Sequence, residues 1–157
     1  MSPISLPLTQ LIHENLSILM SFAFSRQPLE KLVKTKFEGE WKFLRKALFA
    51  IPEQRATKAC IELALFMRLL DDKEDMSGYL KQKSGRSFGR LILKGKPDRR
   101  LELREVANKI IHASDLEWDF SSEHRPVLVC SSESKEKWTR AEIDVVAVAA
   151  FCGQLMS

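Results

Sequence analysis

Residues 52–70, PEQRATKACIELALFMRLL, carry the clearest structural signal in the chain. Apolar side chains recur there at steps of three and four residues, which is the spacing of one face of an α-helix. Pro52 stands at the expected first turn, where a proline is tolerated because its missing N–H is not needed. The stretch therefore predicts an amphipathic helix. Cys60 lies within its apolar stripe, so we expect an inert core thiol there.

Further helices are predicted on both sides of this stretch. Upstream, residues 9–24 show helical spacing, and a second helix is expected to begin at Pro28. Downstream, Asp98 is a suitable N-cap for a helix that runs to about residue 114. Residues 139–142, TRAE, form a capping-box pattern that predicts the start of a last helix, apolar on most sides and therefore central.

Between these last two helices the pattern is typical of strands. Residues 116–120 alternate apolar and polar side chains, and residues 127–130 form a short apolar run. Together they predict a small antiparallel β-hairpin or ribbon at about residues 116–139. The expected architecture is mostly α: a single-domain helical bundle over residues 1–157, with this ribbon before the last helix.

Composition narrows the class of protein. The chain of 157 residues is 45% hydrophobic and 29% charged, which is typical of one folded domain and excludes a disordered chain. Its 3 cysteines are widely spaced and odd in number, so we expect no disulfide framework and a reducing, cytoplasmic compartment. No metal-ligand spacing or phosphate loop occurs, and the apolar runs are shorter than the roughly 20 residues of a membrane span. We therefore expect no cofactor, no metal and no membrane association.

The formal net charge of +4 conceals one strongly basic segment. Residues 81–100 hold eight basic side chains and one acidic side chain, Asp98, which gives +7. The segment predicts an anion-binding surface for RNA or DNA phosphates. The alternative is a solvated loop that balances the acidic parts of the same fold. The eight candidate binding residues are Lys81, Lys83, Arg86, Arg90, Lys94, Lys96, Arg99 and Arg100.

Residues 103–113, LREVANKIIHA, combine a core stripe with a second, polar stripe. Arg104, Asn108 and His112 follow one another at steps of four residues, so they line a slanted stripe beside the core face. His112 can act as a general acid or base near neutral pH, Arg104 can hold a phosphate, and Asn108 can orient the imidazole or donate to an oxyanion. The set suits metal-independent cleavage of RNA. The alternative is that Asn108 and His112 brace the neighbouring ribbon by hydrogen bonds to its backbone.

An arginine followed by a polar residue and a histidine on a late helix resembles the HEPN superfamily, whose ribonucleases carry such a motif. The resemblance implies a helical bundle in which Arg and His of paired subunits build one composite site. It also implies Arg104, Asn108 and His112 as the catalytic residues. One hypothesis is therefore a ribonuclease or RNA-binding relative from a toxin or defence system, with RNA and a second copy as partners. The other is a non-enzymatic interaction module, such as an antitoxin, immunity or regulatory protein, with a protein partner.

Overall fold

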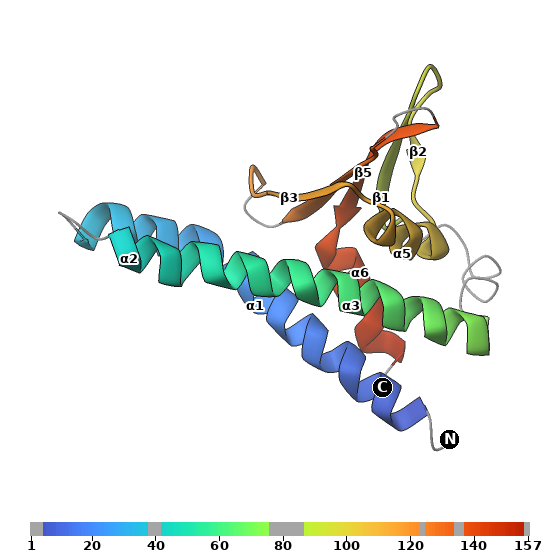
Figure 1. Ribbon diagram of the computed structural model, residues 1–157, viewed down its shortest axis with the longest axis horizontal. Coiled ribbons are helices and arrows are strands. Elements are labelled where there is room, and N and C mark those ends of the chain that lie inside the picture. The colour runs from blue at the N-terminus through green and yellow to red at the C-terminus, as the bar shows by residue number, and fades with distance from the viewer. Residues whose placement is uncertain (1–4, 38–41, 76–86, 123–124, 134–136, 156–157) are drawn as a thin grey trace.

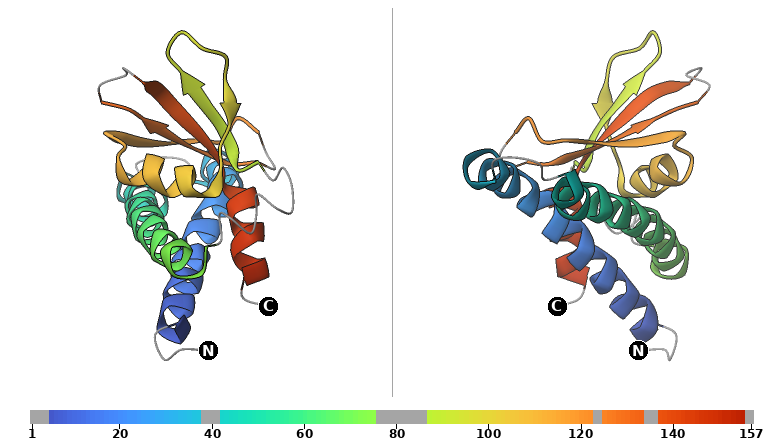
Figure 2. Two further views of the ribbon diagram at one scale, coloured as in Figure 1. Left: turned by 90° about the vertical axis from the view of Figure 1, so that its right-hand side faces the viewer. Right: turned by 60° about the vertical axis from the view of Figure 1, so that its left-hand side comes forward.

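Two long helices and a sheet organise the structure, a computed structural model. Helices α1 (Ser5–Lys36) and α3 (Ile51–Glu74) run antiparallel beneath the sheet (Figure 1). Two shorter helices, α5 (Leu103–Ile111) and α6 (Val145–Leu155), also lie on this side of the sheet (Figure 2). None of the described helices is both long and apolar enough to cross a membrane. The structure describes residues 5–37, 42–75, 87–122, 125–133 and 137–155.

The sheet has five strands in the order β2-β1-β5-β4-β3, and each pairs with its neighbours in the antiparallel sense. The last strand of the sequence, β5, is the central one. Successive side chains of a strand point to opposite faces. Leu91, Leu128 and Ile143 accordingly point towards the helices and are buried. The strands are β1 (Gly89–Leu93), β2 (Arg99–Arg100), β3 (Asp115–Asp119), β4 (Val127–Ser131) and β5 (Trp138–Asp144).

The expected helical bundle is therefore wrong: the fold is α+β, not mostly α, and its sheet is much larger than a ribbon. The strands expected at residues 116–120 and 127–130 are present as β3 and β4. The sequence did not predict that β1 and β2 form within the basic segment, or that β5 continues to Asp144. Two neighbouring strands, β1 and β4, hydrogen-bond to β5 and outweigh the helical capping pattern of residues 139–142.

Two helix starts consequently differ from expectation. The helix expected at Asp98 begins at Leu103, because residues 99–100 pair with β1. Glu102 is its N-cap, and Glu102 and Glu105 form a capping box. The last helix begins at Val145, where the Asp144 carboxylate accepts a hydrogen bond from the Ala147 N–H at 3.1 Å.

Helix α1 continues through Pro28, where the sequence indicated the start of a new helix. A proline inside a helix costs about 3 kcal/mol. Contacts of the two residues that precede it stabilise the helix: Gln27 donates a hydrogen bond to the Phe120 carbonyl at 2.6 Å, and Arg26 lies 4.7 Å from the centre of the Phe49 ring. Tertiary packing thus outweighs the local preference.

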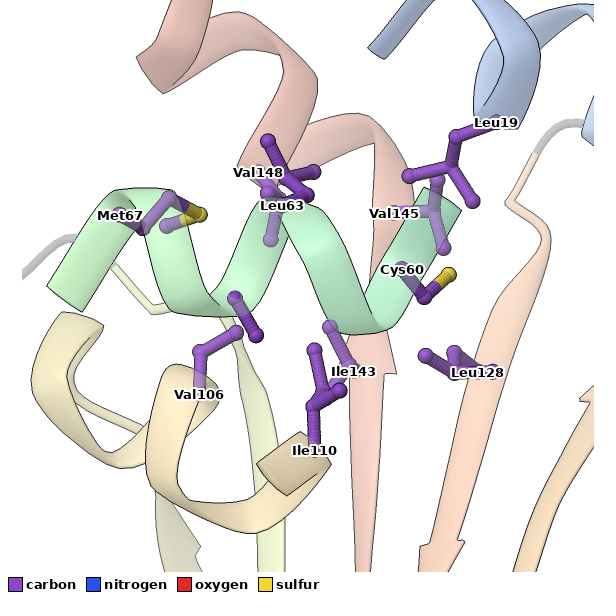
Figure 3. A pocket seen from close by; sticks show the side chains of 11 residues that line it. Leu19, Cys60, Leu63, Met67, Val106, Ile110, Leu128, Ile143, Val145 and Val148 are labelled. Atoms are coloured by element: carbon purple, nitrogen blue, oxygen red, sulfur yellow. The ribbon is translucent and has the colours of Figure 1, made fainter. Parts of the chain in front are cut away.

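The core lies between the helices and the sheet, and α3 is its centre. Eleven side chains from α1, α3, α5, α6, β4 and β5 surround a small cavity of about 20 Å³ (Figure 3). It has room for about one water molecule, but its lining is apolar. The cavity is therefore a packing gap and not a ligand site. Cys60 lines it and is buried, which confirms the core position predicted from the stripe.

Candidate nucleic-acid interface

Part of the basic segment forms a β-hairpin at the edge of the sheet. Arg90 of β1 lies opposite Arg100 of β2, and the turn between the two strands carries Lys94 and Lys96, both exposed. Gly95 has a φ of +68°, a backbone conformation that glycine adopts without steric cost. The hairpin projects away from the long helices (Figures 1 and 2). It therefore presents its turn lysines to solvent.

Two arginines of this hairpin, Arg90 and Arg99, are held in ion pairs. Arg90 lies 3.2 Å from Glu142 and 3.7 Å from Asp98. The two Nη atoms of Arg99 donate to the two carboxylate oxygens of Glu105 at 2.7 and 2.6 Å. This hydrogen bonding raises the pKa of Arg99. Arg90 and Arg99 thus hold the hairpin to β5 and α5. The candidate residues Lys81, Lys83 and Arg86 lie outside the described residues.

Lysines from separate segments of the chain meet at one end of the sheet. Leu93 pairs with Trp138 across β1 and β5, so Lys94 and Lys137 lie next to this pair. Lys109 of α5 approaches from the helix layer, with its Nζ 4.6 Å from the centre of the Trp138 ring. We call this surface the basic end and define it as Lys94, Lys96, Lys109, Lys137 and Arg140.

The electrostatics of the basic end favour an anion. Burial, together with the cations Arg99 and Lys137, lowers the pKa of Lys109, although Glu105 opposes this shift. The crowding of like charges is reduced when a phosphate binds. Within the described part of the chain, the four lysines form no ion pair, whereas Arg140 lies 3.0 Å from Glu142. The lysines are therefore the groups available to an anionic ligand.

An open groove of about 320 Å³ adjoins the basic end, lined by His112, Ser132, Glu133 and Trp138. His112 is the C-cap of α5: its backbone N–H donates to the Asn108 carbonyl at 3.0 Å, and its side chain is exposed. The groove thus combines an aromatic ring, a carboxylate and an accessible acid–base group.

The structure does not bring Arg104 and His112 together within one chain. They stand at opposite ends of α5, and eight helical steps place their α-carbons roughly 12 Å apart. Arg104 Nη1 lies 2.9 Å from both Asp71 Oδ2 and Asp72 Oδ1, and hydrogen bonds to Asp72 and Asp71 raise its pKa. Between the two ends, the buried Asn108 Oδ1 has no hydrogen-bond partner among the described residues.

Sequence reasoning missed three members of the basic end, Lys109, Lys137 and Arg140, and also the neighbouring Trp138. Trp138 also packs partly against the core. The available signal was the alternation of residues 137–140, KWTR, which is typical of a strand with basic and aromatic side chains. The proximity of Lys109 has no signal in the local sequence, because it depends on how α5 packs.

Within the described residues, no group of His, Cys, Asp or Glu side chains could hold a metal ion. Compared with protein-family models, curated proteins and solved structures, the chain matches none of them.

Proposed function

We propose that this protein binds single-stranded RNA across the basic end. The observation that carries the proposal is the convergence of lysines from the β1–β2 turn, α5 and the start of β5 around one tryptophan, Trp138. Lysines neutralise phosphates and release condensed counterions, which supplies affinity. An aromatic ring provides a surface on which an unpaired base stacks. In this arrangement the sugar–phosphate backbone of the RNA runs over the lysines, and one base lies in the groove.

The other groove side chains favour RNA over DNA. Glu133 repels phosphate but accepts hydrogen bonds, and Ser132 and Glu133 both line the groove. The 2′-hydroxyl of RNA is a donor that DNA lacks. We therefore expect an RNA oligonucleotide to bind more tightly than the DNA of the same sequence.

The test is fluorescence anisotropy with a labelled single-stranded RNA, titrated at several salt concentrations. The variant Lys94→Ala/Lys96→Ala/Lys137→Ala removes three exposed lysines of the basic end. We expect it to weaken binding strongly and to lower the slope of log affinity against log salt by about 2, at roughly 0.7 per lost phosphate contact.

The matched control is Lys31→Ala/Lys34→Ala/Lys36→Ala, which removes three exposed lysines from α1. It changes the net charge by the same amount, so it separates local contacts from overall attraction. Equal losses in the two variants, or a wild-type affinity that does not depend on salt, would contradict the proposal.

A second candidate function is RNA cleavage at the same groove, and the observation that favours it is the exposed imidazole of His112 beside Trp138. His112 takes the proton of a 2′-hydroxyl, whose oxygen forms a bond to the adjacent phosphorus. The bond from phosphorus to the 5′-oxygen breaks, and that oxygen takes a proton from water. The products are a 2′,3′-cyclic phosphate and a 5′-hydroxyl.

Cleavage is tested with purified wild-type protein and His112→Ala on the labelled RNA. His112→Ala should abolish cleavage and leave RNA affinity and thermal stability close to those of the wild type. A substrate with 2′-deoxyribose at the cleaved position should remain intact. If the wild type leaves RNA uncut, the binding function stands alone.

A further inference from the structure

We infer that the protein forms an antiparallel homodimer through the outer face of α3. This face carries Ile61, Leu65 and Leu69, which are 41%, 46% and 52% exposed. Steps of four residues advance by about 40° around a helix, so the three side chains form one slanted ridge. Helix α3 crosses in front of α1 and α6 in Figure 1, and this ridge lies on the side away from the core residues Cys60 and Leu63.

The charges around the ridge identify the occupant as a second copy of this chain. Consider two α3 helices that are antiparallel, with a two-fold axis at Leu65. A residue that precedes Leu65 then lies level with the partner residue that follows Leu65 by the same number of positions. Lys58 lies level with Asp72 of the partner subunit, and Glu62 lies level with Arg68 of the partner subunit. Both pairs join opposite charges.

The same charges exclude a parallel arrangement, which would place each of these residues beside its own copy. Like charges at that distance repel. A further pair also joins opposite charges in the antiparallel arrangement: Arg55 lies level with Asp75 of the partner subunit. The ridge itself is symmetric: Ile61 meets Leu69 of the partner subunit, and Leu65 meets its own copy.

Three of these groups, Lys58, Glu62 and Asp72, already have ion-pair partners within the chain. Lys58 lies 3.8 Å from Glu62, and Asp72 lies 2.9 Å from Arg104. In the dimer these contacts become parts of larger networks. A contact between single helices belongs to the small class of interfaces, below about 1,200 Å² in total. We therefore expect an affinity in the micromolar range.

The test is sedimentation velocity of the full chain over a concentration series from about 1 to 200 μM, which brackets that affinity. Wild-type protein should change from monomer to dimer across the series. Leu65→Asp should remain monomeric, whereas Leu32→Asp, at a 41% exposed leucine of α1, should dimerise like the wild type. Circular dichroism establishes that each variant is folded. A wild type that stays monomeric, or a Leu65→Asp variant that dimerises, would overturn the inference.

A pair of charge reversals tests the antiparallel register. Glu62→Arg alone places arginine level with Arg68 of the partner subunit, and Arg68→Glu alone places glutamate level with Glu62 of the partner subunit. Each variant should dimerise at least tenfold more weakly than the wild type. An equimolar mixture of the two should form a heterodimer with near wild-type affinity, because both pairs are again opposite in charge. A mixture no tighter than either variant would overturn the register. No nucleic acid is present, so the result is independent of the proposed RNA binding.

Discussion

The ammonium group of Lys109 lies 4.6 Å from the centre of the Trp138 ring, which joins α5 to the first residue of the central strand. This contact couples the helix layer to the end of the sheet where lysines gather. It also places a cation next to an aromatic ring, and under the proposed function these would contact a phosphate and a base. The two residues together should therefore determine how the protein contacts a base.

Trp138→Ala should lower the affinity for single-stranded RNA by about tenfold or more. A base stacked on an aromatic side chain contributes about 1–3 kcal/mol. Trp138→Phe keeps a ring and should retain most of the affinity. Anisotropy titrations of both variants at one salt concentration measure the difference. Equal binding by wild type and Trp138→Ala would remove stacking from the mechanism.

Arg104→Ala should destabilise the fold, because it removes the cation that lies 2.9 Å from the Asp71 carboxylate, and Asp71 is only 6% exposed. Arg104→Lys should lose less stability than Arg104→Ala, since lysine keeps the positive charge. Urea unfolding followed by circular dichroism gives both values. An unchanged unfolding midpoint in Arg104→Ala, together with loss of RNA cleavage, would instead support the catalytic role that the sequence motif indicates.

The sequence was informative wherever one local pattern decided the structure. The apolar stripe of residues 52–70 predicted α3, because burial of one helix face outweighs other preferences. The strands β3 and β4 also followed from local alternation. By contrast, residues 139–142 resemble a helix start and become part of β5 because two other strands hydrogen-bond to them. Such pairing is set by residues distant in sequence.

The candidate site also contains residues that the sequence identified and residues that only the fold brings together. Counting charges identified Lys94 and Lys96, because a dense basic segment is visible in the sequence alone. Lys109 and Trp138 are 29 positions apart and meet only through the packing of α5 on the sheet. The sequence placed Arg104, Asn108 and His112 along one helix, α5. Because α5 is nine residues long, Arg104 and His112 lie at its opposite ends.

Gly89→Ala should destabilise the protein severely. Gly89 has a φ of +138°, and a Cβ added there would collide with the backbone carbonyl of Glu142 on β5. The matched control is Gly153→Ala in α6, where nothing lies within 4 Å of the added Cβ. Alanine is favoured over glycine inside a helix by about 0.5–1 kcal/mol, so the control should be neutral or stabilising. Thermal unfolding of the two variants compares them, and similar melting temperatures would contradict the placement of β1.

The free energy of unfolding should vary with pH in the acidic range because of Glu105. Burial opposes ionisation of its carboxylate, but hydrogen bonds from Arg99 and the Glu102 N–H outweigh burial and lower its pKa. A carboxylate whose pKa is lower in the folded than in the unfolded state stabilises the protein fully at a pH above its unfolded-state pKa. This stabilisation is lost as the pH falls through its folded-state pKa. Glu105→Gln should therefore cost about 1 kcal/mol at pH 7, because Arg99 is half exposed and solvent screens the pair.

The difference between wild type and Glu105→Gln should shrink as the pH falls below about 4.5. Unfolding in urea at a series of pH values measures it. A difference that stays constant from neutral to acidic pH would show that the loss comes from the capping box alone and not from the charge.

The three thiols should be unreactive in the folded protein. Cys60, Cys130 and Cys152 are all buried, and desolvation raises the pKa of Cys130 and of Cys152 to about 12. Only the thiolate attacks a disulfide reagent, and at pH 8 about one thiol in ten thousand is ionised at that pKa. Reaction with such a reagent should therefore follow unfolding, with all three thiols reacting in denaturant. Rapid reaction of even one thiol in native buffer would contradict the packing of α3, β4 and α6 against one another, because each of these elements contributes one of the cysteines.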